Sequence, residues 1–192
     1  GGISISGQPK TGHLYIEGGM LSRDGRCTPF DSEATGTVFS EGGGVLVLKR
    51  LEDAISDKDS ILAVIKGVGL NNDGANKMSF TAPSVEGQYD AILKAQIDGN
   101  IHPETIGYIE AHGTATPIGD PIEVEALRKA FRQRTDKKNF CVLSSIKSNI
   151  GHLTAAAGVA GVIKSVLILQ KKIIPGTQYF KSPNPHLAIE ES

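Results

Sequence analysis

The sequence has few cysteines and little net charge, and each of these features argues against certain classes of protein. Its two cysteines, Cys27 and Cys141, lie far apart and in no spacing typical of a zinc site. We therefore expect neither a disulfide framework nor a structural metal, and this use of cysteine fits a reducing cytoplasm. With 20 basic and 21 acidic residues, the net charge of −1 provides no field that would attract nucleic acid or an anionic membrane.

The sequence also lacks a long apolar run and a secretory signal. Its longest apolar stretch, residues 155–169, is shorter than the roughly 20 residues of a spanning helix and contains Lys164, so it predicts a buried helix. Residues 1–12 have no basic segment leading into an apolar run. With 39% apolar residues over 192 positions, the chain can bury one ordinary core, and we expect a soluble cytoplasmic protein without membrane or nucleic-acid partners.

Short apolar runs alternate with helical patterns along the chain. Ser84 can cap a helix that stops at a left-handed Gly99, and Asp120 can cap another with Pro121 at its first position. Alternation of this kind predicts an α/β structure with a largely parallel sheet, whose functional groups gather beyond the carboxyl ends of the strands. The runs that predict strands are residues 45–48, 61–65, 106–109 and 140–143.

Two histidines follow the ends of predicted strands. His112 comes after the run at 106–109, and His152 comes after the run at 140–143. If the fold brings them together, two neutral imidazoles could each donate an Nε2 hydrogen to one oxyanion. Loss of one such donor costs on the order of 3 kcal/mol in barrier height. The pattern fits acyl transfer or a Claisen condensation.

Other interpretations of these histidines remain open from the residues alone. His112 could simply lie in a tight strand-to-helix connection made with Gly113 and Gly119. A metal site built from His112, His152, Asp120 and Cys141 is disfavoured, because no pair among them has the close spacing of usual zinc ligands. The remaining histidines follow no strong strand and are interpreted as ordinary surface or core residues: His13, His102 and His186.

Two long motifs carry a family resemblance. Residues 110–127 (EAHGTATPIGDPIEVEAL) and 145–161 (SIKSNIGHLTAAAGVAG) closely resemble the two histidine motifs of β-ketoacyl synthases, especially the ketosynthase domains of modular polyketide synthases. Shorter similar segments extend the resemblance over nearly the whole chain: residues 18–31, 42–51, 71–74, 81–83 and 182–186.

The resemblance implies a thiolase-like α/β fold and a Cys-His-His triad. Such a triad joins an acyl chain to a malonyl-type extender on acyl carrier protein by decarboxylative Claisen condensation. His112 and His152 match the triad histidines, and Lys147 matches a buried lysine that orients the second histidine. Thr114 and Thr116 match hydroxyls that bond the phosphopantetheine arm of the carrier protein. No cofactor is implied to bind this domain directly.

The chain also departs from the family pattern. The usual nucleophile segment, Ala-Cys-Ser-Ser, would lie before Gly1, and a glycine-rich loop with the final strands would lie after Ser192. Cys27 and Cys141 occupy positions that are not catalytic in the family. Gly161 stands where some relatives have a glutamate, so the acidic partner of Lys147 is unassigned.

The resemblance therefore implies an incomplete ketosynthase domain that is inactive alone. Residues 1–60 are expected to be a connecting segment and the end of the N-terminal half, and residues 61–192 the C-terminal half without its final strands. The implied partners are acyl carrier protein, the missing N-terminal half and, in the full protein, a second copy. The alternative is a non-catalytic partner subunit of the chain-length-factor type. A thiolase is disfavoured, because its second cysteine has no counterpart near the carboxyl end.

Overall fold

A parallel pair of strands lies at the centre of the computed structural model, which describes residues 1–7, 12–74 and 83–189. The two strands pair through Tyr108–Val142, Ile109–Leu143 and Glu110–Ser144, which sets their register. The elements in chain order are β1 (Gly2–Ser4), β2 (Gly42–Gly44), α1 (Leu51–Ser56), α2 (Val85–Asp98), η1 (Pro103–Thr105), β3 (Tyr108–Glu110), α3 (Gly119–Phe131), β4 (Val142–Ser144), α4 (Lys147–Ile150), η2 (Thr154–Ala156), α5 (Ala157–Lys171) and η3 (Pro185–Leu187).

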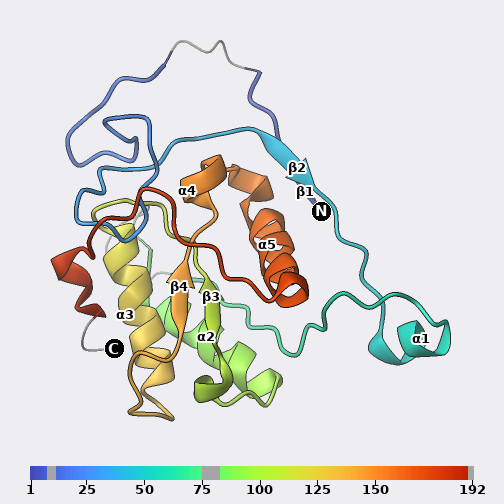
Figure 1. Cartoon of the computed structure of the whole chain (residues 1–192). Coiled ribbons are helices and arrows are strands. Elements are labelled where there is room, and N and C mark those ends of the chain that lie inside the picture. Colours follow the sequence, from blue (N-terminus) through green and yellow to red (C-terminus); the bar gives the residue numbers. More distant parts are fainter. Residues whose placement is uncertain (8–11, 75–82, 190–192) are drawn as a thin grey trace.

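Helices cover both faces of this strand pair. Side chains alternate between the faces of a strand, so Ile109 and its partner Leu143 point to one face, where they pack with Val124 of α3. Glu110 and its partner Ser144 point to the other face, where they meet α5. Figure 1 shows α3 and α5 on opposite sides of β3 and β4. The α/β architecture with parallel strands that the sequence predicts is confirmed around this pair.

The N-terminal segment wraps around the strand pair as irregular chain. β1 and β2 form a separate antiparallel pair, and residues 12–41 form no helix or continuous strand before the chain reaches β2 (Figure 1). Phe39 bridges to His152 in parallel fashion, and Asp31 bridges to Pro183. This N-terminal segment therefore pairs directly with one of the two predicted site histidines, His152.

Two of the four strand predictions are wrong. Residues 45–48 and 61–65 form no strand, and Val47 is 95% exposed. A strand needs a neighbour for its N–H and C=O groups, and within the described residues neither run has one. β2 lies just before the first run, at Gly42–Gly44.

The helices follow the sequence more closely, with differences at their ends. Ser84 caps α2 as predicted, and its Oγ accepts a hydrogen bond from the N–H of Gly87. Gly99 is right-handed at φ −78°, and the left-handed residue is Asn100 at φ 48°. Asp120 does not cap α3, because its carboxylate is bonded to other backbone groups of the site.

Helix α5 combines an apolar composition with one buried lysine. Together η2 and α5 make an 18-residue run, Thr154–Lys171, with a mean hydropathy of 1.3, of which 11% is buried. Length and composition alone would let such a helix cross a membrane, although core helices of soluble proteins meet the same criterion. The predicted helix is confirmed, but the prediction that it is buried is wrong for this chain, since Lys164 is its buried residue. Leu169, for example, is 63% exposed.

Candidate active site

The loops after β3 and β4 bring the predicted site residues together. The rings of His112 and His152 meet edge to face, with centroids 5.2 Å apart and planes at 84°. Lys147 begins α4, the short helix that leads from β4 to His152. The carboxyl ends of parallel strands lie at the same edge of a sheet, which explains why residues distant in sequence converge here.

Helix α3 holds the loop of His112 through a carboxylate. Glu123 accepts hydrogen bonds from the backbone N–H of His112 at 2.6 Å and from that of Gly113 at 2.8 Å. Burial raises the pKa of Glu123, and these two bonds oppose that rise. Gly113 has φ +40°, and a Cβ there would lie 2.7 Å from the Cβ of Ser145, so the position requires glycine. The backbone around His112 is therefore fixed by a side chain of the following helix.

A second carboxylate of α3 ties this loop to the N-terminal segment. Asp120, 1% exposed, accepts hydrogen bonds from the N–H of Phe30 at 2.8 Å and of Ala115 at 3.0 Å. Burial raises the pKa of Asp120 to about 6, against the effect of those bonds. Ala115 has φ +59°, so the loop is strained at the residue that Asp120 holds.

Lys147 connects the two histidine loops, because it lies on the loop that leads to His152 and bonds the loop of His112. Its side chain is buried, and its Nζ donates a hydrogen bond to the backbone oxygen of His112. Burial lowers the pKa of Lys147, while the nearby charges of Glu123 and Glu110 raise it. Glu123 is thus the strongest acidic influence on Lys147. The family resemblance implies that Lys147 orients His152. In the structure, Lys147 instead bonds the backbone oxygen of His112.

His152 is held mainly by backbone contacts. Its N–H donates to the oxygen of Val38 at 2.7 Å, and its oxygen accepts from the N–H of Ser40 at 3.1 Å. The Nδ1 of the ring accepts a hydrogen bond from the N–H of Thr154 at 3.0 Å. An accepting Nδ1 leaves the hydrogen of a neutral imidazole on Nε2, so His152 has a donor at that nitrogen.

The surroundings of both imidazoles favour the neutral form. Desolvation, together with the charge of Lys147, lowers the pKa of His112 to about 4, although part of the residue is open to solvent. The same two influences lower the pKa of His152. Two neutral rings side by side can donate hydrogen bonds to one small oxyanion without repelling each other as cations.

The two threonines predicted to bind a pantetheine arm lie on the loop of His112. The hydroxyl oxygens of Thr114 and Thr116 are 3.1 Å apart, and Thr116 Oγ1 also accepts from the N–H of Gly119 at 3.1 Å. Both side chains are partly exposed. The loop thus presents a pair of hydroxyls next to His112.

Neither cysteine has the setting of a nucleophile. Cys27 is 3% exposed, and burial raises the pKa of its thiol. Burial likewise raises the pKa of Cys141 to about 11. Thiols of this kind carry little thiolate at neutral pH. Among residues 1–7, 12–74 and 83–189, no group of three or more histidine, cysteine, aspartate or glutamate side chains could hold a metal ion.

Sequence reasoning missed the acidic residues that support this site. The sequence assigns no role to Glu123, and it predicts Asp120 as the cap of α3. Glu110 opens the first histidine motif, and Lys164 interrupts an apolar run, yet the two form a buried ion pair with a distance of 2.8 Å. A single lysine within an apolar helix indicates a buried acidic partner, and Glu110 was the acid closest in sequence to His112.

Comparisons with known proteins agree across the whole chain. Residues 62–181 match the family described as Beta-ketoacyl synthase, C-terminal domain, and residues 1–54 match Beta-ketoacyl synthase, N-terminal domain. Polyketide synthase PksL of Bacillus subtilis is 49% identical over 100% of this chain and 4% of its own length. A component of the phenolphthiocerol/phthiocerol polyketide synthase of Mycobacterium tuberculosis is 47% identical over 100% of this chain and 13% of its own length.

A solved structure shows the same fold. The ketosynthase from module 1 of the bacillaene synthase of Bacillus amyloliquefaciens is 44% identical, with a TM-score of 0.92, and the match covers 100% of this chain and 34% of that chain. The fold is therefore thiolase-like, as the sequence resemblance implied. The chain spans about a third of that solved ketosynthase and a much smaller share of the curated relatives.

Proposed function

The chain belongs to the β-ketoacyl synthase family, as part of a ketosynthase domain of a modular polyketide synthase, and we propose that its two histidines perform the decarboxylative half of a Claisen condensation. The substrates are an acyl thioester and a malonyl-type extender carried on the phosphopantetheine arm of acyl carrier protein. The product is a β-ketoacyl thioester.

The reaction places negative charge on one oxygen. The bond between the extender's carboxylate and its α-carbon breaks, carbon dioxide leaves, and the electron pair forms an enolate on the thioester. His112 and His152 donate hydrogen bonds to the enolate oxygen. The α-carbon then attacks the acyl thioester, a carbon–carbon bond forms, and the sulfur of the nucleophile leaves as a thiolate.

The observation that supports this proposal is the arrangement of the two rings. Their centroids are 5.2 Å apart, both have lowered pKa values, and His152 has its hydrogen on Nε2. Fixed neutral donors stabilise a developing oxyanion without reorganisation at the moment of reaction. A pair of cationic histidines would hold the charge as well, but it would require the opposite pKa shifts.

The remaining parts of the reaction are assigned by chemistry. Thr114 and Thr116 hydrogen-bond the phosphopantetheine arm, because their hydroxyls lie together beside His112. Neither cysteine of this chain accepts the acyl group, since Cys27 is buried, Cys141 is half-buried and burial raises the pKa of both thiols. We infer that this region works with the remainder of the N-terminal half and as a homodimer in the complete domain.

Carbon dioxide release from malonyl carrier protein by the intact ketosynthase tests the proposal. We expect His112→Ala and His152→Ala each to slow release about 100-fold or more. His186→Ala is a matched control, because that histidine is exposed on η3 and should leave the rate unchanged. Normal release by both site variants would contradict the assignment.

An acylation experiment on the intact ketosynthase distinguishes a catalytic domain from a non-catalytic partner subunit. Mass spectrometry after incubation with an acyl thioester should show one acyl group on a cysteine other than Cys27 and Cys141. An intact domain that takes up no acyl group, yet assembles with a second ketosynthase, would support the partner subunit instead.

A further inference from the structure

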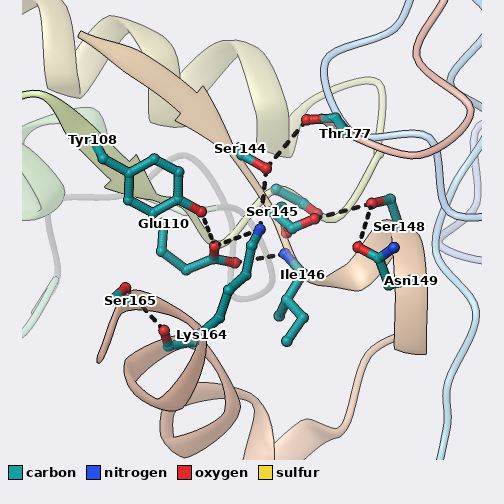
Figure 2. A network of polar contacts seen from close by, with 12 residues as sticks. Tyr108, Glu110, Ser144, Ser145, Ile146, Ser148, Asn149, Lys164, Ser165 and Thr177 are labelled. Carbon is teal, nitrogen blue, oxygen red and sulfur yellow. Dashed lines mark hydrogen bonds and ion pairs between the residues drawn. The ribbon is translucent and has the colours of Figure 1, made fainter. Parts of the chain in front are cut away.

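An ion pair behind the histidines connects three segments of the site. Glu110 ends β3 and Lys164 lies in the middle of α5, and their charged groups are 2.8 Å apart. Both side chains are about nine-tenths buried. Figure 2 shows the carboxylate and the ammonium pointing toward each other between the strands and the helix. A buried charge persists only when it is paired and hydrogen-bonded, so each group depends on the other.

The ammonium of Lys164 is held from a second direction. It donates a hydrogen bond to Ser144 Oγ at 3.1 Å, and the same Oγ is bonded to Thr177 Oγ1 at 3.1 Å (Figure 2). Ser144 pairs with Glu110 in the register of β3 and β4, which is why one lysine reaches both. Lys164 therefore has a fixed position at the end of both strands.

The carboxylate of Glu110 reaches the neighbouring loop with its other oxygen. Oε2 faces Lys164 and accepts a hydrogen bond from the Tyr108 hydroxyl, whereas Oε1 accepts one from the N–H of Ile146 at 2.5 Å. Ile146 comes directly before Lys147, whose Nζ bonds the main chain of His112. Glu110 is therefore connected to His112 in two ways. It lies two residues before His112 in the chain, and it also contacts the loop after β4, whose Lys147 bonds the backbone oxygen of His112.

Helix α5 leaves room for this carboxylate. A Cβ at Gly161 would lie 3.2 Å from Cγ of Glu110, which is tighter than ordinary van der Waals contact. Gly161 is one turn before Lys164 on the same helix, so the residue that makes space and the residue that supplies the charge face the strand end together.

We propose that Glu110 and Lys164 are a positioning pair for the histidine site: Lys164 fixes the carboxylate, and the carboxylate fixes the backbone of Ile146 and with it the contact of Lys147 with His112. This inference rests on the function proposed above. This role requires no contact of either residue with substrate. Their effect is on the rate of the chemical step, through the placement of the loop that carries Lys147.

Two double variants of the intact ketosynthase separate positioning from stability. Both remove the ion pair without leaving a lone buried charge: Glu110→Met with Lys164→Met, and Glu110→Gln with Lys164→Met. Apolar replacement of a buried ion pair is often neutral for stability. The glutamine oxygen can still accept from Ile146, whereas methionine cannot.

The measurements are melting temperature, kcat for carbon dioxide release and KM for malonyl carrier protein. We expect the methionine pair to lose about tenfold or more in kcat with KM unchanged. The glutamine variant should keep kcat within about threefold of wild type, because its bond to Ile146 remains. Equal kcat in the two folded variants would overturn the positioning role. If the methionine pair does not fold, loss of activity in the folded glutamine variant would overturn it.

His112→Ala in the same assay separates this inference from the proposed function. Unchanged release by that variant would contradict the function itself. Loss of release by His112→Ala, together with normal kcat in the methionine pair, would contradict only the positioning role of Glu110 and Lys164.

Discussion

The loops that carry the two histidines are held by different kinds of contact. The loop of His112 is fixed by ionisable side chains, since Asp120 and Glu123 of α3 bond its backbone N–H groups and Lys147 bonds its carbonyl. The loop of His152 is fixed by main-chain pairing with residues 38–40 and by a glycine before the histidine. The backbone at His112 therefore depends on pH and charge, whereas the backbone at His152 itself depends on main-chain shape.

The largest expected effect concerns Asp120 and the pH dependence of stability. Its folded pKa, about 6, is above the unfolded value of about 3.9, so the contribution of Asp120 to stability is fully present below about pH 4 and is lost as pH rises through 6. Asp120→Asn removes that fall. Relative to wild type, we expect the variant to gain roughly 3 kcal/mol in unfolding free energy between pH 3 and pH 8.

Asp31 offers a matched control with the opposite sign. It is also buried, which by itself would raise its pKa, but bonds from the N–H groups of Lys181, Glu33 and Ser182 outweigh burial and lower it. The contribution of Asp31 to stability is therefore lost as pH falls through its folded pKa. In Asp31→Asn, the free energy of unfolding should decrease less at acidic pH than it does in wild type. Denaturant unfolding of the intact ketosynthase at several pH values measures both variants. A pH-independent difference for Asp120→Asn would contradict the first prediction.

Glu123 tests whether a side chain places His112. Glu123→Ala removes the acceptor of two backbone N–H groups and leaves the loop free to move, so we expect carbon dioxide release to fall about 100-fold. Glu125→Ala is the control, because Glu125 is an exposed residue of the same helix that pairs with Arg128. Equal rates for the two variants would show that α3 does not place the histidine.

Gly151 tests the other loop. It has φ +73°, and a Cβ there would lie 2.8 Å from Ser40 Oγ and from the oxygen of Val38. Gly151 has ψ −171°, a combination essentially restricted to glycine, so Gly151→Ala should cost about 1 to 3 kcal/mol in unfolding free energy from backbone strain alone. Gly176→Ala, with no positive φ and no atom near its Cβ, should cost less. If Gly151→Ala changed neither the free energy of unfolding nor the titration of His152, backbone shape would not be what fixes this loop.

The sequence predicted the two histidines because each follows an apolar strand within a long, specific motif. It also predicted the helices with clear apolar periodicity, such as α2 with its cap at Ser84. The supporting residues were harder to predict, because Asp120 and Glu123 have the pattern of an ordinary helix start. Only the tertiary arrangement shows that their carboxylates turn back to the preceding loop.

The two apolar runs that were wrongly predicted as strands show the other limit. Residues 45–48 and 61–65 have the composition of buried strands, yet composition does not provide a hydrogen-bonding neighbour. Residue type therefore identifies which segments can pair, and the fold decides which of them do. The parallel pair of β3 and β4 forms because α3 and α5 cover its faces.

Nitrogen-15 NMR of the histidine rings in the intact ketosynthase tests the central claim most directly. The account predicts that both rings are neutral at pH 7, that the hydrogen of His152 is on Nε2, and that His112 titrates near pH 4. A cationic ring at pH 7, or a hydrogen of His152 on Nδ1, would contradict the claim that the two histidines are paired neutral donors to one oxyanion.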